Sequence, residues 1–256
     1  MIHLSILGPA LIAGALVLST HVPLGQEVLR RGIIFLDLAI AQVAALGLVI
    51  ALRIGLDTQG EHGNQVLMQV IAMGAAIIGA SFLYQFRHLA TPIQEALIGI
   101  VFILSATGGI LLLSTDPHGG ERLKEILIGQ ILWVEYSALL VTGLIYFPVL
   151  LIWFRCRQKM GEYAFYPLFA VTVTLSTQLI GIYLVFASLI VPALASQHLG
   201  KSLPFAYGIG CIGYILGLIF SALFDLPSGA MISWCLVSVS LIFIVLTRGK
   251  SARFHS

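Results

Sequence analysis

Charged residues are scarce in this chain, which has 256 residues of which 9% are Asp, Glu, Lys or Arg. A soluble domain carries about 25% charged residues, so this chain has too little polar surface to cover a globule in water. Its net charge of +2 is small and dispersed, which argues against a nucleic-acid partner. Its three cysteines, Cys156, Cys211 and Cys235, show no paired spacing, which argues against a disulfide framework or a cysteine metal cluster.

Several catalytic signatures are also missing from the sequence. It has no Gly-x-x-x-x-Gly-Lys-Ser/Thr phosphate loop, no His-Glu-x-x-His helix and no Gly-x-Ser-x-Gly elbow. We therefore expect that the chain is not an enzyme and that it hydrolyses neither ATP nor peptide bonds by itself.

Apolar runs dominate instead, because 59% of the residues are hydrophobic. Runs of about 20 such residues recur along the whole length, which predicts an all-α polytopic membrane protein with about eight transmembrane helices. We expect a single transmembrane domain, residues 1–256. The predicted spans are residues 4–24, 32–52, 66–86, 93–113, 136–153, 168–192, 205–224 and 230–246.

Local signals refine these spans. Pro23 is expected to end the first span, and no Lys or Arg precedes Arg30, so this span is expected to be retained rather than cleaved as a signal. A polar linker over residues 114–125 leads to a short apolar piece over residues 126–134. That piece is too short to cross a bilayer and is expected to be re-entrant or interfacial.

The stretch 30–47, RRGIIFLDLAIAQVAALG, carries the most informative polar residue, Asp37. A carboxylate near the middle of a membrane helix costs roughly 2.5–3.5 kcal/mol on insertion scales, so it is kept where it faces protein, water or a ligand. Asp37 contacts a cation on a translocation path, or it pairs with Arg30, Arg31 or a neighbouring helix. Both interpretations stay open at this point.

The side chains that share the helix face of Asp37 are small and apolar. Ala41 and Ala44 share it, whereas Gln42 lies about 140° away at 100° per residue. Gln42 therefore makes a hydrogen bond to another helix, or it reaches the ion only if the helix is distorted.

Other polar residues are fewer still. Glu95 opens the fourth span three residues after Pro92, where an acid also suits a helix N-terminus. Gln178 lies inside the sixth span. In the linker, His118 and Glu121 are candidate ligands for zinc or manganese, although exposed loop residues of these types are usually only solvated.

The distribution of Lys and Arg barely distinguishes the two orientations in the membrane. With both termini in the cytoplasm, Arg30 and Arg31 lie outside. Basic residues on the outer face need another explanation, such as an acidic partner.

Four stretches resemble the membrane subunits of the ABC importers that take up zinc, manganese or iron. They are residues 22–47, VPLGQEVLRRGIIFLDLAIAQVAALG; residues 95–114, EALIGIVFILSATGGILLLS, continued by LKEILIGQILWV; residues 179–200, LIGIYLVFASLIVPALASQHLG; and residues 219–230, IFSALFDLPSGA. They occur in the family's order and extend over nearly the whole chain.

The resemblance implies a type II, vitamin B12-importer-like permease in the bacterial inner membrane. Such a permease forms a homodimer around a path for a divalent metal ion, which is its transported substrate rather than a permanently bound cofactor. A separate cytoplasmic subunit hydrolyses ATP, and a periplasmic or lipid-anchored protein delivers the metal. In related importers, outer-face arginines meet acidic residues of the delivering protein, a role that falls here to Arg30 and Arg31.

The resemblance also places a short coupling helix for the ATPase after Pro192, within residues 193–201. The residues concerned are Ala195, Ser196, Gln197, His198, Leu199, Gly200 and Lys201. The alternative for this segment is an ordinary turn between two spans.

One departure from the family concerns the metal ligands. Family members often carry an Asp and a His four residues apart in the second span and another His in the fourth. Asp37 matches the acid, but position 41 is Ala, and the fourth span has Phe102 and Ile103 where the His is sought. The ion then passes with oxygen ligands, helped by His118, or the cargo is a chelated metal or a small organic molecule. A transporter or scaffold without an ATPase is the remaining alternative.

Overall fold

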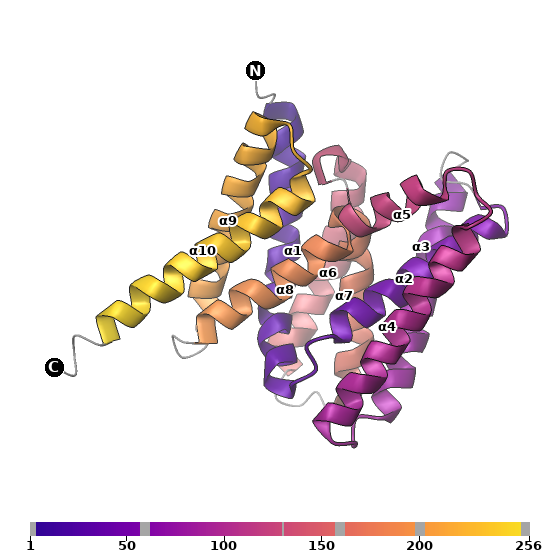
Figure 1. The fold of residues 1–256 in the computed structure, drawn as a ribbon, viewed down its shortest axis with the longest axis horizontal. Helices are drawn as coiled ribbons and strands as arrows, with labels where there is room; N and C mark the ends of the chain where they lie inside the picture. The colour runs from indigo at the N-terminus through magenta and orange to yellow at the C-terminus, as the bar shows by residue number, and fades with distance from the viewer. Residues whose placement is uncertain (1–3, 57–61, 130, 157–161, 198–202, 252–256) are drawn as a thin grey trace. The chain divides into compact units, whose positions relative to one another are not determined.

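The protein is described by a computed structural model that covers residues 4–56, 62–129, 131–156, 162–197 and 203–251. These residues form ten α-helices and one turn of 3-10 helix, with no β-strand among them (Figure 1). The elements are α1 (Leu4–Arg31), α2 (Leu36–Arg53), α3 (His62–Gln85), α4 (Thr91–Leu113), α5 (Gly119–Ile128), η1 (Ile131–Trp133), α6 (Tyr136–Cys156), α7 (Glu162–Ile180), α8 (Ile182–Gln197), α9 (Leu203–Phe224) and α10 (Ser228–Ser251). The prediction of an all-α fold is confirmed.

In the part of the chain that the structure describes, seven helices are long and apolar enough to cross a membrane, namely α1, α2, α3, α4, α6, α9 and α10. Each overlaps one predicted span. The prediction of one span over residues 168–192 is wrong, because two shorter helices, α7 and α8, meet inside it. Their apolar parts are Ala164–Ile180 and Ile182–Gln197.

Gly181 produces this break between α7 and α8. Its φ of +80° lies in the left-handed region, where a right-handed helix cannot continue and glycine is the favoured residue. A Cβ at Gly181 would lie 2.3 Å from the backbone nitrogen of Gly129, and Gly129 itself has a φ of +68°. The two backbones therefore touch, which only a pair of glycines allows.

Helix α1 is longer than predicted, because it continues through Pro23 to Arg31. Proline removes one backbone donor, a loss that membrane helices tolerate where their neighbours satisfy the freed groups. Close packing follows directly after Pro23. A Cβ at Gly25 would lie 2.0 Å from the carbonyl oxygen of Leu189 in α8, so α1 and α8 are in backbone contact at this turn.

The predicted linker over residues 114–125 is partly helical. Helix α5 begins at Gly119, because Asp116 folds the chain into a turn in front of it. The backbone N–H of His118 donates to Oδ1 of Asp116 at 2.9 Å, and the N–H of Gly119 donates to the carbonyl oxygen of Asp116 at 3.0 Å. A side-chain oxygen of Asp often initiates such a turn.

The chain divides into two compact units, each built from separate segments. The first comprises Met1–Arg31, Ile128–Leu150 and Leu179–Ser256, and the second comprises Gly32–Leu127 and Leu151–Gln178. The expected single membrane domain over residues 1–256 stays a prediction.

In the first unit, α1 packs against α8 and α9, and α10 packs against α8 and α9. Glycines permit the close approaches, as small residues do at helix interfaces in membranes. A Cβ at Gly217 of α9 would lie 2.4 Å from the Cα of Ile232 in α10. Hydrogen bonds join α1, α8 and α9 to one another: Gln26 donates to Ser196 (3.3 Å), the hydroxyls of Ser188 and Tyr214 share one (2.7 Å), and Tyr207 donates to the carbonyl of Ser19 (3.0 Å).

In the second unit, α2 lies beside α3 and α4 (Figure 1). A Cβ at Gly47 would lie 2.7 Å from the Cβ of Ala75, and one at Gly79 would lie 3.0 Å from a methyl carbon of Val43. Helix α2 is consequently buried over most of its surface, from Leu36 to Ala51.

We predict that Gly181→Ala destabilises the protein strongly. The positive φ alone costs on the order of 1–3 kcal/mol for a residue with a Cβ, and the added carbon overlaps backbone atoms that cannot move aside. The matched control is Gly74→Ala in α3, where an added Cβ meets nothing within 4 Å. Thermal unfolding in detergent should show a lower midpoint for Gly181→Ala and an unchanged one for Gly74→Ala; equal midpoints for the two variants would contradict the packing described here.

Candidate functional site

Asp37 lies in the first turn of α2, directly after a tight connection from α1. Gly32 in that connection has a φ of +72°, and the N–H of Leu36 donates to the carbonyl oxygen of Ile33 at 3.2 Å. The Asp37 side chain is 0% exposed. Neither of its carboxylate oxygens has a hydrogen-bond partner in the part of the chain that the structure describes.

This environment leaves the Asp37 carboxylate uncompensated. A buried charge normally requires an ionic or hydrogen-bonding partner. The helix N-terminus supplies some positive potential in the first turn, but it supplies no hydrogen bond to Asp37. Orphaned buried oxygens of this kind fit a site whose cation comes from outside the protein.

Glu95 approaches the same end of α2 from α4. Helix α4 begins at Thr91 with Pro92 in its first turn, a position that proline favours. The half-buried Glu95 carboxylate faces the backbone N–H groups of Ile34 and Phe35, but neither of its oxygens reaches hydrogen-bonding geometry. The structure thus brings Glu95 to the connection that leads into Asp37.

The other predicted ligands do not join this pair. Gln42 is 7% exposed and lies on another face of α2. His118 and Glu121 are exposed at the start of α5, and Arg53, the last residue of α2, donates a hydrogen bond to the neighbouring Thr115. His118 and Glu121, which follow Thr115 closely in the chain, therefore lie towards the opposite end of α2 from Asp37.

An 18-residue helix is about 27 Å long, so this structure places His118 far from Asp37. The described residues also contain no group of three or more His, Cys, Asp and Glu side chains that could hold a metal ion. The roles of Gln42, His118 and Glu121 stay predictions.

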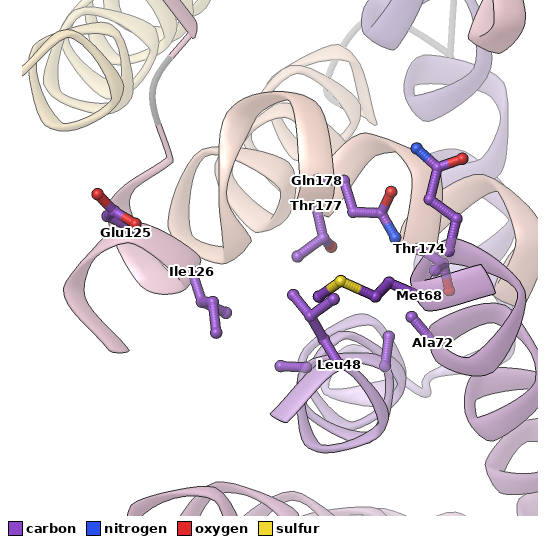
Figure 2. A pocket seen from close by; sticks show the side chains of 11 residues that line it. Leu48, Met68, Ala72, Glu125, Ile126, Thr174, Thr177 and Gln178 are labelled. Atoms are coloured by element: carbon purple, nitrogen blue, oxygen red, sulfur yellow. The ribbon is translucent and has the colours of Figure 1, made fainter. Parts of the chain in front are cut away.

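A cavity of about 310 Å³ opens on the Asp37 face of α2, further along the helix. Figure 2 shows Leu48 of α2, Met68 and Ala72 of α3, and Thr177 and Gln178 of α7 around one hollow. The full lining is Ala44, Ala45, Leu48, Met68, Gln69, Ala72, Glu125, Ile126, Thr174, Thr177 and Gln178. Among these, Ile126 points toward the hollow and the Glu125 carboxylate points away from it.

Sequence reasoning counted Gln178 among the polar residues of the spans but assigned it no role. It missed Thr174 and Thr177. The available signal was the pattern Thr-x-x-Thr-Gln at residues 174–178, which places three polar side chains close together on an apolar helix.

Arg30 and Arg31 both bind one acid, Glu27. The Nε of Arg31 donates to Oε1 of Glu27 at 2.8 Å and the Nε of Arg30 to Oε2 at 3.0 Å. The Arg30 side chain is 56% exposed and that of Arg31 is 19% exposed, whereas Glu27 is 2% exposed. Arg30 is therefore the more exposed of the two arginines, and Glu27 fixes its position; the docking role of both stays a prediction.

The predicted coupling segment is only partly described. Ala195 and Ser196 are buried at the end of α8, where Ser196 accepts a hydrogen bond from Gln26. Gln197 is partly exposed. His198, Leu199, Gly200 and Lys201 lie outside the described residues.

The ABC 3 transport family matches the chain over residues 3–170 and again over residues 157–247. The chain belongs to the ABC 3 transport family. The expected resemblance to metal-uptake permeases is confirmed, and the chain is a non-enzymatic membrane subunit of this family. Its seven long apolar helices agree with a multi-pass protein of the bacterial inner membrane.

Named relatives extend over nearly the full chain. The manganese transport system membrane protein MntC of Listeria monocytogenes is 27% identical, and the match covers 95% of this chain and 91% of that protein. The high-affinity zinc uptake system membrane protein ZnuB of Haemophilus influenzae is 23% identical, over 97% of this chain and 98% of that protein.

A solved structure of PsaBC from Streptococcus pneumoniae in complex with Fab superimposes with a TM-score of 0.70. The two chains are 21% identical, and the match covers 94% of this chain and 91% of that one. This similarity confirms the polytopic permease fold of the ABC 3 transport family for the present chain.

We predict that Asp37→Asn raises the thermal stability of the apo protein and abolishes its stabilisation by Mn²⁺. The substitution removes a buried charge that has no partner, and such a charge costs several kcal/mol. A bound ion stabilises only a protein that holds it. The measurement is the unfolding midpoint in detergent with and without Mn²⁺, with Glu135→Gln, which removes an exposed carboxylate, as the control. A wild type and an Asp37→Asn variant that respond equally to Mn²⁺ would exclude Asp37 as a ligand.

Proposed function

We propose that this chain is the membrane-spanning subunit of an ABC importer that carries a divalent transition metal ion, with manganese as the favoured cargo. The observation that carries the proposal is the fully buried Asp37 carboxylate, whose oxygens have no hydrogen-bond partner in the described structure. An ionisable residue inside a membrane helix marks an ion pathway when no internal partner compensates it. The named manganese and zinc relatives support the same cargo class.

The donor chemistry favours manganese over zinc. Asp37 and Glu95 offer only carboxylate oxygens at the start of α2, and position 41, one turn beyond Asp37, is alanine. Carboxylate and water ligands suit Mn²⁺, whereas imidazole suits zinc. Iron stays a further possibility of the same class, and the uptake experiment below includes it.

The cavity beside α2 favours a second candidate, transport of a metal chelate or a small organic molecule. Its volume of about 310 Å³ reaches the lower end of the range for small-molecule sites. This alternative predicts that free metal ions are not accumulated and that chelated metal is.

The partners of the chain in the importer are also proposals. A second copy of the chain would complete the path, and an ATP-hydrolysing subunit would contact the segment from Gln197 onward. A transporter without an ATPase is the competing idea, and copurification of a nucleotide-binding subunit would exclude it. An extracytoplasmic metal-binding protein with an acidic surface would dock at Arg30, whose guanidinium is exposed beside Glu27.

Elemental analysis of vesicles that contain the whole complex tests the cargo. ATP is enclosed in the vesicles, on the side that corresponds to the cytoplasm, and the three metals are supplied outside at equal concentration. We expect the vesicles to accumulate more manganese than zinc or iron. Asp37→Asn should abolish accumulation while the complex still assembles. Accumulation of a chelate but of no free ion would establish the alternative cargo, and normal uptake by Asp37→Asn would remove this carboxylate from the mechanism.

Arg30→Glu tests the docking role. Reversal of an exposed charge at a rim mainly slows association and changes its salt dependence, so the association rate of the metal-binding protein should fall about tenfold or more at low salt. Arg53→Glu at the other end of α2 serves as the control and should leave that rate unchanged. Equal effects of the two substitutions, measured by surface binding kinetics, would refute docking at Arg30.

A further inference from the structure

The cavity beside α2 stands on the same helix face as Asp37. Asp37, Ala41, Ala44 and Leu48 follow one another at spacings of four, three and four residues, which places them on one stripe of the helix. Ala44, Ala45 and Leu48 line the cavity. At 1.5 Å per residue, they lie about 10–17 Å from Asp37 along the helix axis. We refer to this cavity as the inner chamber.

Two buried threonines of α7 give the inner chamber its polar wall. Thr174 is 0% exposed and Thr177 is 8% exposed. The hydroxyl of Thr174 donates to the carbonyl oxygen of Ala170 at 2.8 Å, and that of Thr177 donates to the carbonyl oxygen of Val173 at 2.8 Å. Because each hydroxyl proton is already used, both oxygens are left with lone pairs and act only as acceptors.

The rest of the lining supports the same chemistry. Gln69 and Gln178 add amide side chains, each with a carbonyl oxygen that accepts hydrogen bonds and an NH2 group that donates them, and no Lys or Arg lines the inner chamber. Met68, Ala72 and Leu48 complete it with apolar surface. The four oxygens of Thr174, Thr177, Gln69 and Gln178 can accept hydrogen bonds from a bound molecule that donates in several directions, as the water molecules around a metal ion do.

The volume of the inner chamber is large enough for a hydrated metal ion. A water molecule occupies about 30 Å³ in the liquid, so a volume of about 310 Å³ accommodates an ion together with a full first shell of water. Neutral oxygens hold an ion less tightly than a carboxylate does, and a transport path needs sites that release the ion as well as sites that bind it.

We propose that the inner chamber is a second binding station, which holds the divalent metal ion with its water shell after the ion leaves Asp37. The proposal rests on the proposed transport function and names the residues that receive the ion. Thr174 and Thr177 contact the aqua ligands through their free lone pairs, and Gln178 provides a third acceptor. Asp37 removes part of the water shell, and the inner chamber restores it.

Chemical protection tests this station without relying on transport. The protein for this test carries Ala45→Cys, and its native Cys156, Cys211 and Cys235 are replaced by Ser. It is assayed in the complete complex without ATP. Ala45 lines the inner chamber, and this change leaves all its oxygen donors in place. We expect Mn²⁺ to slow alkylation of the introduced thiol by the neutral reagent N-ethylmaleimide, relative to Na⁺ at equal ionic strength. The protection should persist with Asp37→Asn and disappear with Thr174→Val/Thr177→Val.

Uptake kinetics supply the second readout. The Thr174→Val/Thr177→Val variant should lower the maximal rate of Mn²⁺ uptake about tenfold, the effect of losing about one hydrogen bond to a charged group. The Mn²⁺ concentration at half-maximal uptake should stay unchanged, because Asp37 is intact. Thr177→Ser retains the oxygen and should transport like the wild type.

Thr107→Val is the matched control, because Thr107 also donates to a carbonyl four residues earlier, that of Ile103, and lies outside the inner chamber. Alkylation that is equally fast with Mn²⁺ and Na⁺ would overturn the proposal, as would a wild-type uptake rate in the double valine variant. If wild-type vesicles accumulate no metal while Mn²⁺ still protects the introduced thiol, the proposed transport function is refuted and the metal site stands.

Discussion

A carboxylate without a partner is energetically costly in an apolar setting, and this cost determines which ligand the start of α2 can bind. Asp37 sits where this cost is highest, fully buried and without a hydrogen bond from the described residues. Helix α2 can hold it there because small residues let α3 and α4 pack directly against the helix. Gly47, for example, leaves no room for a side chain beside Ala75. Asp37 is fully buried in this packing, and a low-dielectric setting strengthens the attraction between its carboxylate and a cation.

The side chains around α2 change between its first turn and its middle. Asp37 and the nearby Glu95 carry carboxylates at the first turn, whereas Thr174, Thr177 and Gln178 offer neutral polar groups beside Ala44 and Leu48. A single deep charged site would trap a divalent ion. A step from charge to dipoles instead lowers the binding energy along the helix without a return to bare hydrocarbon.

Much of the fold could be predicted from the sequence because the hydrophobic length of a membrane helix is a local property. Seven helices match their predicted spans for this reason. The break at Gly181 and the continuation of α1 through Pro23 were not predicted, because both depend on backbone contacts with distant segments, at Gly129 and Leu189. At the site, Asp37 could be identified since an acid in an apolar run is conspicuous. Thr174 and Thr177 could not, because a threonine satisfied by its own helix looks inert until the space beside it is known.

The division of the chain has a consequence for biogenesis. The first compact unit combines residues 1–31 with residues 179–256, so α1 meets its partners α8 and α9 only after the intervening helices have been inserted. Within α1, Thr20 and His21 already hydrogen-bond to the carbonyl oxygen of Val17, and Glu27 pairs with Arg30 and Arg31. The hydrogen bond from Gln26 to Ser196, by contrast, requires α8. Local pairing of this kind lets the early helix carry buried polar side chains while the last third of the chain is being made, since polar side chains in hydrocarbon are costly without partners.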